Sequence, residues 1–439
     1  MSRIGIIIIG SIFIFSIQNY AQKTKILFIG NSYTYTNDLP ITLKNLALCL
    51  GDTIVYDQST PGGYRLIDHA SNATTLSKIK AENWDFVVIQ AQSQEPSWPP
   101  SQLESEVYPY AAILNDSIKS NFECTEVVFF MTWGRKYGDS QNCSSSPPVC
   151  TFSGMQERLV AGYMTMAERN RSTIAPVGLA WKYCMDNDTD SLINLFSSDN
   201  SHPSISGTFL TACVLYAVIF KKNPIYASYS SSLNQQTASF LKNISNEVVL
   251  GTNYSYTFND NYTGTNYYLT KNDWYKNGHL IVPNYNYIIN NNTVSFNNET
   301  INGTDYIWDF GDGTFSTDVS PIHTYSTNSE YIVSLSISNS CYNEFIKDTI
   351  NILTSAINGN IRSVSFYPIP ANFYIDIKFD QPASGTCHIL NILGQETAKF
   401  TLNNQMEYRI DISNLNTGQY ILQYIDNTGH TKFFKIIKI

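Results

Sequence analysis

The stretch KILFIGNSYT, residues 25–34, decides the fold of the first half of the chain. Its first six residues form an apolar run bounded by a glycine, which predicts a buried strand. A helical segment follows, with Asp38 placed to cap it and Pro40 in its first turn. A strand that turns directly into a helix is the start of a βα unit. Ser32 then lies just beyond the carboxyl end of the strand, where a hydroxyl can face a cleft.

The same alternation continues outward from this stretch to about residue 250. The apolar runs predict strands at 25–30, 53–58, 85–90, 126–133 and 174–181. The longer amphipathic segments predict helices at 39–50, 65–81, 101–119, 154–170, 205–221 and 233–249. Strands that alternate with helices form a parallel sheet covered on both faces. We therefore expect an α/β fold, a three-layer α/β/α sandwich, whose function collects at the carboxyl ends of the strands.

A base and a carboxylate for Ser32 stand near the end of this region. Asp199 and His202 form an Asp-x-x-His step directly before the apolar helix at 205–221. A serine nucleophile requires a base that a carboxylate orients, and this spacing lets Asp199 accept the Nδ1 proton of His202. The alternative is a capping Asp beside a surface His. His69 lies within a predicted helix, and we expect it to be structural.

Donors for a developing oxyanion are expected from the loops after the first three strands. Ser32 offers its own backbone N–H, and Gly63, after the second strand, permits close backbone approach. The third strand ends in Gln92-Ser93-Gln94-Glu95, where Gln94 is the expected amide donor and Gln92 the alternative. Each of these segments read alone would be an ordinary βα turn.

Taken together, these residues resemble the SGNH (GDSL-like) hydrolase family over residues 22–250. Asn31 stands where the family's first block has Asp, and the family's Gly-x-Asn-Asp block is replaced by the residues around Gln94. The resemblance implies a five-stranded α/β/α sandwich, Ser32 as nucleophile, His202 as base and Asp199 as the residue that orients it. It also implies Ser32, Gly63 and Gln94 as the oxyanion hole and cofactor-free ester hydrolysis. No sequence pattern for a metal site or a phosphate-binding loop is present.

The composition changes after residue 250. Residues 251–283 are rich in Asn, Tyr and Thr without helical periodicity, and we expect a linker or loose strands. Residues 284–353 carry short alternating strands around Trp308-Asp309-Phe310-Gly311-Asp312-Gly313 and resemble a PKD domain, a small β-sandwich. Asp309 and Asp312 are expected to build the turn, with calcium binding as the alternative.

The two ends of the chain indicate export. Residues 1–21 read as a secretory signal peptide, with Arg3 ahead of a short apolar run, and no later segment is long enough to span a bilayer. Residues 362–439 resemble the type IX secretion C-terminal sorting domain through their Pro-x-Pro opening, Leu-Gly-Gln turn, Leu-x-x-Gly-x-Tyr strand and Lys-rich end. The alternative is another β-sandwich binding module. The resemblance implies passage through the type IX machinery to the cell surface or beyond.

Composition supports this location. The 439 residues include 14% charged residues, 30 Tyr and 23 Phe, with a net charge of −9. An acidic chain without a basic run is a poor nucleic-acid binder. The cysteines are too few for a disulfide scaffold. Cys143 and Cys150 bracket a polar loop and are expected to form a local disulfide, whereas Cys49, Cys124, Cys184 and Cys213 are expected to be buried thiols.

The sequence thus predicts a secreted or cell-surface serine esterase that acts on acyl esters, with acetyl groups on a carbohydrate as the expected substrate. Two alternatives stay open: a non-catalytic surface-binding protein on the same fold, and a lipase or phospholipase. Asn31 and the altered third block motivate the first alternative. An apolar lid, which would favour the second, is not evident in the sequence.

Overall fold

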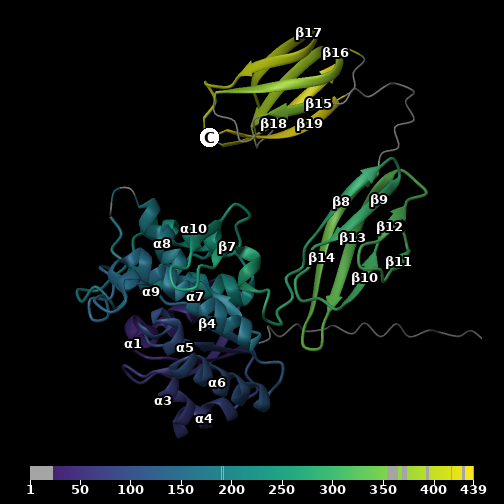
Figure 1. Cartoon of the computed structure of the whole chain (residues 1–439). Coiled ribbons are helices and arrows are strands. Elements are labelled where there is room, and N and C mark those ends of the chain that lie inside the picture. The colour runs from purple at the N-terminus through teal and green to yellow at the C-terminus, as the bar shows by residue number, and fades with distance from the viewer. Residues whose placement is uncertain are drawn as a thin grey trace, which may run out of the picture. The chain divides into compact units, whose positions relative to one another are not determined.

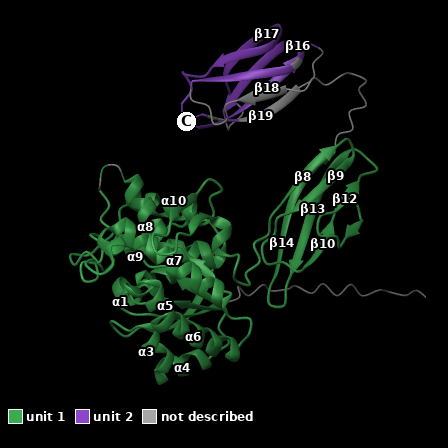
Figure 2. Cartoon of the chain, in the orientation of Figure 1, with its two compact units in different colours: residues 1–354 green, residues 355–439 purple. Residues whose placement is uncertain are grey.

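The computed structural model describes residues 23–188, 190, 192–352, 364–367, 373–391, 395–416, 418–427 and 431–438. The predicted signal peptide lies outside the described residues, as do parts of the Pro-x-Pro and Leu-Gly-Gln segments. The chain divides into two compact units, residues 1–354 and residues 355–439 (Figure 2). The first unit contains both the α/β domain and the predicted PKD-like domain.

The α/β domain is built on a five-stranded parallel sheet. Its strand order is β2-β1-β3-β4-β5, with bounds Lys23–Ile29 (β1), Thr53–Ser59 (β2), Phe86–Ile89 (β3), Glu126–Phe130 (β4) and Thr173–Ala175 (β5). In register, Ile29 lies beside Ser59 of β2 on one side and Ile89 of β3 on the other. The first three strands therefore end level with one another, and the loops that follow them meet at one edge. The expected α/β fold with a parallel sheet is confirmed.

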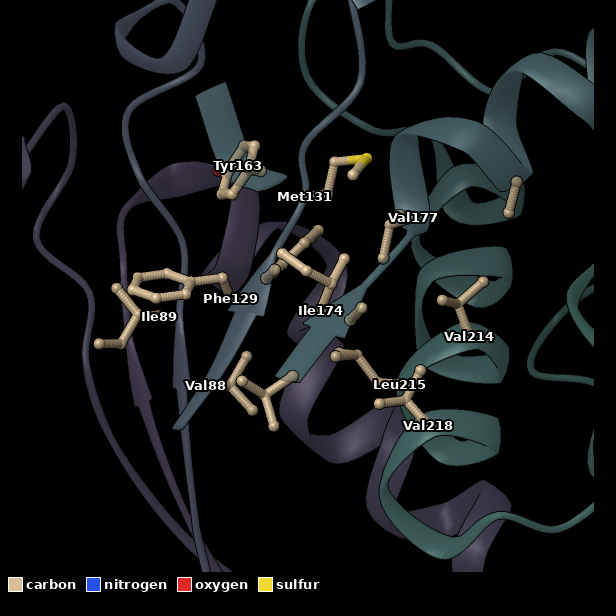
Figure 3. Packing of buried hydrophobic residues seen from close by; sticks show 14 of the residues in the cluster. Val88, Ile89, Phe129, Met131, Tyr163, Ile174, Val177, Val214, Leu215 and Val218 are labelled. Atoms are coloured by element: carbon tan, nitrogen blue, oxygen red, sulfur yellow. The ribbon is translucent and has the colours of Figure 1, made fainter. Parts of the chain in front are cut away.

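Helices cover the sheet because its strands are apolar on both faces. They are α1 (Ser32–Tyr35), α2 (Leu39–Cys49), α3 (Leu66–Ser71), α4 (Ala73–Lys80), α5 (Pro100–Glu106), α6 (Tyr108–Asn121), α7 (Phe152–Asn170), α8 (Val177–Asn187), α9 (Ile205–Phe220) and α10 (Gln235–Val249). In Figure 3, α9 presents Val214, Leu215 and Val218 toward the strands that carry Val88 and Ile174. All five side chains are at most 1% exposed.

Two predicted elements differ from the observed ones. The run at 174–181, predicted as a strand, is a strand only to Ala175, and α8 begins at Val177. A short apolar run is compatible with either a buried strand or a buried helix. In residues 177–181 the helical conformation is the one that packs against the rest of the domain. The helix predicted over 65–81 is interrupted at Asn72, whose extended backbone and side-chain oxygen cap α4.

Residues 251–283, expected to be a linker or loose strands, contain regular strands and are not a linker. The strands β6 (Ser255–Asn259) and β7 (Asn266–Thr270) form a hairpin, followed by a short 3₁₀ helix, Lys271–Trp274. Trp274 is fully buried in the core of the α/β domain, and its indole N–H donates to the Val248 carbonyl. The aromatic residues that made the segment look loose are what anchor it, because their large apolar area is buried against the helices.

The PKD-like domain consists of two antiparallel sheets that share one core (Figure 1). One sheet has the order β11-β10-β13-β14 and the other β12-β9-β8. The bounds are Tyr285–Asn290 (β8), Thr293–Asn298 (β9), Asp305–Asp309 (β10), Phe315–Ser316 (β11), Ile322–Thr324 (β12), Ser329–Ser338 (β13) and Asn343–Ile352 (β14). Trp308 and Phe310 lie in the core.

The cysteines correct two further predictions, because neither Cys124 nor Cys49 is a buried thiol. Cys124 is not a buried thiol: it forms a disulfide with Cys341, which joins the segment before β4 to the PKD-like domain. Cys49 is exposed, whereas Cys184 and Cys213 are buried free thiols. Cys143 and Cys150 are joined by a disulfide. A pairing across 217 residues gives no local signal in the sequence, which is why Cys124 was assigned only by its apolar neighbours.

The second unit is a single antiparallel β-structure. Its strands are β15 (Val364–Tyr367), β16 (Tyr374–Asn391), β17 (Glu396–Asp411), β18 (Gly418–Asp426) and β19 (Thr431–Lys438). The sheet order is β15-β16-β18-β19, with β17 paired to β16. Alternate residues of β16 and β18, among them Ile375, Ile377 and Leu422, form its core. In the described residues of the whole chain, no helix is long and apolar enough to cross a membrane.

Candidate active site

Asn31 connects the three loops at the carboxyl edge of the sheet. It is 2% exposed, and its side-chain oxygen accepts the backbone N–H of Tyr33 and so caps α1. Its backbone N–H donates to Gln90 Oε1 after β3 (2.9 Å), and its side-chain amide donates to the Tyr64 carbonyl after β2 (2.9 Å). An amide can accept and donate at the same time, which a carboxylate cannot. The change from Asp to Asn is therefore compatible with an ordered site.

Ser32, His202 and Asp199 come together in one chain of hydrogen bonds. His202 Nε2 lies 2.8 Å from Ser32 Oγ, and His202 Nδ1 contacts Asp199 Oδ2. The other oxygen of Asp199 accepts the backbone N–H groups of Ser201 (3.0 Å) and His202 (2.9 Å). We assign the tautomer from these partners: an ionised carboxylate can only accept, so Nδ1 carries the proton and Nε2 is free to accept the Ser32 hydroxyl proton.

The environment keeps Asp199 ionised. Its partial burial works to raise the pKa, but hydrogen bonds from the His202 ring and from the backbone N–H groups of Ser201 and His202 outweigh that effect. The pKa of Asp199 is therefore lowered from its usual value. A carboxylate that stays charged at neutral pH can orient the ring and stabilise its protonated form.

Aromatic residues hold the loop that carries the base, and the sequence reasoning missed them. The Trp133 indole N–H donates to the Ser201 carbonyl (2.9 Å), and the Tyr33 hydroxyl lies 2.6 Å from Ser201 Oγ. Trp133 stacks on Tyr33 at 4.7 Å between ring centroids and on Trp181 at 3.8 Å. The sequence feature that could have indicated this role is the position of Trp133, three residues beyond the end of β4. These contacts hold Ser201, the residue before His202, and Tyr33 also meets the His202 ring edge-on at 5.3 Å between ring centroids.

The expected oxyanion donors differ in whether their N–H groups already donate to another acceptor. The Ser32 N–H is the first of α1 and has no acceptor within that helix. Gly63 has a positive φ of 74°, and a Cβ added there would meet no atom within 4 Å, so the space over it is open. Gln94 is different, because its side-chain amide donates to Asp139 Oδ2 (2.9 Å) and to Gln141 Oε1 (3.0 Å). Both of its N–H groups are thus engaged away from Ser32.

Gln92, the alternative donor, is only weakly engaged. Its side-chain amide nitrogen lies 3.4 Å from Gln94 Oε1, while its carbonyl oxygen accepts the Gln94 backbone N–H at 2.7 Å. Gln90, which the sequence reasoning did not select, uses its carbonyl oxygen for Asn31 and for the Thr34 hydroxyl (2.9 Å). This arrangement leaves Gln92 as the better of the two expected amide donors.

His69 has a structural place, as expected. It is fully buried, with Nε2 at 2.9 Å from the Gly30 carbonyl and Nδ1 at 3.0 Å from the Thr75 hydroxyl. Burial is the main cause that lowers its pKa, which keeps the ring neutral. His69 therefore braces the turn before Ser32 without facing the nucleophile. Among the described residues, no group of three or more His, Cys, Asp or Glu side chains is placed to hold a metal ion.

Comparison with known proteins identifies the two C-terminal segments. Residues 286–352 match the PKD domain family, and residues 365–439 match the family described as a secretion system C-terminal sorting domain. The comparison with curated proteins found no match. The aspartates of the PKD-like turn contact their own loop: Asp309 accepts the Gly311 N–H, and Asp312 accepts Thr314 and lies 2.7 Å from His323 Nε2.

Solved structures resemble the α/β domain. A DUF4886 family protein from Bacteroides uniformis is 16% identical, with 55% of this chain and 98% of that chain covered and a TM-score of 0.45. A candidate SGNH hydrolase from Slackia heliotrinireducens is 25% identical, with 45% and 100% covered and a TM-score of 0.37. A lipase from Streptomyces rimosus is 14% identical, with 44% and 99% covered and a TM-score of 0.32.

All three TM-scores are below 0.5. The fold of this domain is defined by its strand order, β2-β1-β3-β4-β5, and the site by its own contacts. The chain is a secreted or cell-surface protein that carries a PKD domain and a secretion system C-terminal sorting domain behind its α/β/α domain.

Proposed function

We propose that the α/β domain is a serine hydrolase that cleaves carboxylic esters. One observation carries the proposal: the continuous contact from Asp199 through His202 to Ser32, with Nε2 at 2.8 Å from the hydroxyl oxygen. A nucleophile, a base within hydrogen-bond reach and a carboxylate that orients the base are the arrangement that acyl transfer requires.

The chemistry follows from these atoms. Ser32 Oγ attacks the ester carbonyl carbon while His202 Nε2 takes the hydroxyl proton, and Asp199 stabilises the resulting imidazolium. The negative charge on the carbonyl oxygen is met by the N–H groups of Ser32 and Gly63, with Gln92 as the third donor. His202 then protonates the leaving alcohol. Water attacks the acyl-enzyme with the same residue as base, and the acid is released.

The substrate we propose is an acyl ester, acetyl foremost, on a glycan outside the cell. Support comes from the sorting domain, which sends the enzyme to where such polymers are met, and from the attached PKD domain. The sorting domain is proposed to engage the type IX secretion machinery during export. A lipase would instead need an apolar surface at the site, and the loops around Ser32 are rich in amides and hydroxyls.

The test uses the full chain, because residues 254–275 contribute to the core of the α/β domain and a fragment that ends at residue 250 would lack them. Wild type and Ser32→Ala are compared for labelling by a fluorophosphonate and for hydrolysis of 4-nitrophenyl acetate. We expect labelling and turnover in the wild type only. Equal signals in both proteins would reject Ser32 as nucleophile, and no signal in either would favour a non-catalytic binding protein.

A further inference from the structure

A cavity of about 240 Å³ lies between the loops that follow β3 and β4, and we call it the Trp98 cavity. One wall comes from the segment after β3 and the other from the loop after β4. Its lining consists of Ser97, Trp98, Pro99, Gln102, Asp139, Asn142, Ser145, Ser146 and Val149. One indole therefore stands among amides and hydroxyls, and this mixture suits a ligand with both apolar C–H faces and hydroxyl groups.

The single carboxylate in the lining is already satisfied. Asp139 is fully buried, and its oxygens accept from the side-chain amides of Gln94 (2.9 Å) and Asn142 (2.6 Å) and from the Gln141 N–H (3.1 Å). Burial works to raise its pKa, but these hydrogen bonds and the charge of Arg135 outweigh it and lower the pKa. Asp139 thus holds the loop in shape, and the groups left to a ligand are uncharged.

The walls of the cavity are fixed in advance. The disulfide Cys143–Cys150 closes the loop that contributes Ser145, Ser146 and Val149. Ser146 Oγ is hydrogen-bonded to the Tyr262 hydroxyl of the β6–β7 hairpin. A wall that needs no ordering when a ligand arrives loses less entropy on binding.

The opposite wall is held by the same hairpin. Asp260 forms an ion pair with Arg158, whose side chains are 2% and 3% exposed, and Arg158 also donates to the Trp98 carbonyl (3.1 Å). Arg65 lies over the Trp98 ring, 4.7 Å from its centroid. The segment that looked like a linker in sequence is therefore a brace for both walls.

Contacts connect the Trp98 cavity to the catalytic residues. Gln94 contacts Asp139, and Arg135, which lies 3.7 Å from Asp139, reaches Ser93 at 3.4 Å. The next residue, Lys136, donates its N–H to the Asn200 carbonyl (2.9 Å), within the loop that carries Asp199 and His202. The cavity and the triad thus share the loops after β3 and β4.

We propose that the Trp98 cavity is a subsite for one neutral sugar unit of the acylated glycan, with Trp98 as its apolar platform. The proposal rests on the proposed esterase function, whose substrate class it specifies. The cavity is smaller than sites that enclose drug-sized molecules, which range from roughly 300 to 1,000 Å³, and this size favours a single ring over a longer segment. Sugar hydroxyls match the Ser145 hydroxyl and the side-chain carbonyl oxygens of Gln102 and Asn142, whose amide nitrogens donate to Glu106 and Asp139.

The experiment measures kcat/KM of the full chain on two kinds of ester: 4-nitrophenyl acetate, which has no sugar, and acetylated oligosaccharides of xylose, mannose, glucose and N-acetylglucosamine. The variants are Trp98→Ala, Ser145→Trp, which fills the cavity from an exposed position, and Trp98→Phe, which restores an aromatic platform. Tyr226→Ala is the matched control, because Tyr226 is an aromatic residue that is 80% exposed and lies outside the cavity.

We expect Trp98→Ala and Ser145→Trp to lower kcat/KM on the preferred acetylated oligosaccharide by roughly threefold to tenfold, the value of one aromatic contact. Activity on 4-nitrophenyl acetate should stay within about twofold, and Trp98→Phe should recover most of the loss. Equal losses on both esters, or no loss on any oligosaccharide, would overturn the subsite.

A wild type that hydrolyses neither ester would contradict the esterase function, and the subsite is then tested by binding alone. The same oligosaccharides are titrated calorimetrically into wild type and Ser145→Trp. Binding to the wild type that the variant loses supports the subsite without catalysis, and absence of binding to the wild type rejects it.

Discussion

Among the described residues of the first unit, two histidine–aspartate pairs are joined by a side-chain contact, one in each domain, and they are built differently. In the α/β domain, Asp199 contacts Nδ1 of His202, and Nε2 faces Ser32 at 2.8 Å. In the PKD-like domain, Asp312 faces Nε2 of His323 at 2.7 Å. The His202 and Asp199 side chains are 36% and 48% exposed, whereas those of His323 and Asp312 are 15% and 16% exposed.

The neighbours of the two rings explain the difference in role. His323 stacks on Phe310 at 4.0 Å between ring centroids and meets Tyr325 edge-on at 4.5 Å, so its faces are used for packing. His202 has its outer nitrogen directed at a hydroxyl and an accessible side. The same two residue types thus leave a histidine nitrogen facing a serine hydroxyl in one domain and pack the histidine ring against aromatic side chains in the other.

Replacing each histidine with alanine gives the largest expected contrast. His202→Ala should lower kcat/KM on a short ester by roughly 10⁴-fold to 10⁶-fold, because the nucleophile loses its base. His323→Ala should leave kcat/KM within about twofold but lower the Tm of the PKD-like domain, since a stacked ring is removed. Ester kinetics and calorimetry of the full chain check both. Loss of activity in His323→Ala would show that the PKD-like domain takes part in the reaction.

Replacing each aspartate with asparagine should give the next largest contrast in activity. Asp199→Asn should cost roughly 10³-fold to 10⁴-fold in kcat, because an amide can hold Nδ1 in the wrong tautomer and does not stabilise the imidazolium. Asp312→Asn serves as the matched control and should keep wild-type kcat. The measurement is steady-state kinetics with single-turnover acylation. Equal kcat in Asp199→Asn and wild type would mean that Asp199 only caps its loop.

The proximity of Ser32, Asp199 and His202 could be predicted from the sequence. Each lies where the boundary of a strand or helix fixes its position, Ser32 in a βα turn and the other two in an Asp-x-x-His step before a helix. The parallel sheet was found because its strands are apolar on both faces and alternate with helices. The local sequence pattern is enough to predict these strands and loops. The register of β1 with β2 and β3 then places the loops at the same edge of the sheet.

The supporting contacts could not be found the same way, because they join residues distant in sequence. Trp133 reaches Ser201, Cys124 pairs with Cys341, and Trp274 enters the core of a domain that seemed to end before it. The direction of the Gln94 side chain could not be predicted from the sequence either, because its partner Asp139 lies 45 residues away. Each of these depends on tertiary packing, which overrides local composition.

The disulfides test how far the two domains act as one body. Cys341→Ser opens a bridge that spans 217 residues, whereas Cys143→Ser opens one that spans 7. In the chain-entropy model a bridge contributes more when it closes a longer loop, so we expect about 2–5 kcal/mol from the first and less from the second. Urea unfolding of both variants measures this.

Thiol counting is the control for the pairing. The denatured wild type should present four thiols without reductant, Cys49, Cys184, Cys213 and Cys387, and eight with it. A count of six without reductant would mean that one of the two bridges is absent in the protein. A larger loss of stability in Cys143→Ser than in Cys341→Ser would show that the interdomain bridge couples the domains weakly.

The smallest expected effect is the pH dependence of the stability that Asp312, paired with His323, contributes to the PKD-like domain. Burial works to raise the pKa of Asp312, but hydrogen bonds from Thr314 and His323 outweigh it, so the pKa is lowered from its usual value. A carboxyl whose pKa is lower in the folded state stabilises the fold above its unfolded pKa of about 3.9, and that contribution is lost as the pH falls through the folded value. Asp312→Asn lacks this charge at every pH.

The stability difference between wild type and Asp312→Asn should therefore shrink as the pH is lowered from about 5 to below the ordinary pKa of an aspartate, about 3.9. Hydrogen-exchange mass spectrometry of β13 peptides measures the difference at each pH, and the intrinsic exchange rate cancels because the two proteins share that peptide sequence. Asp199→Asn in the same experiment should leave exchange in β13 unchanged. A difference that grows toward acid would mean that Asp312 destabilises its turn when charged, and the contrast between a reactive and a structural pair would need another origin.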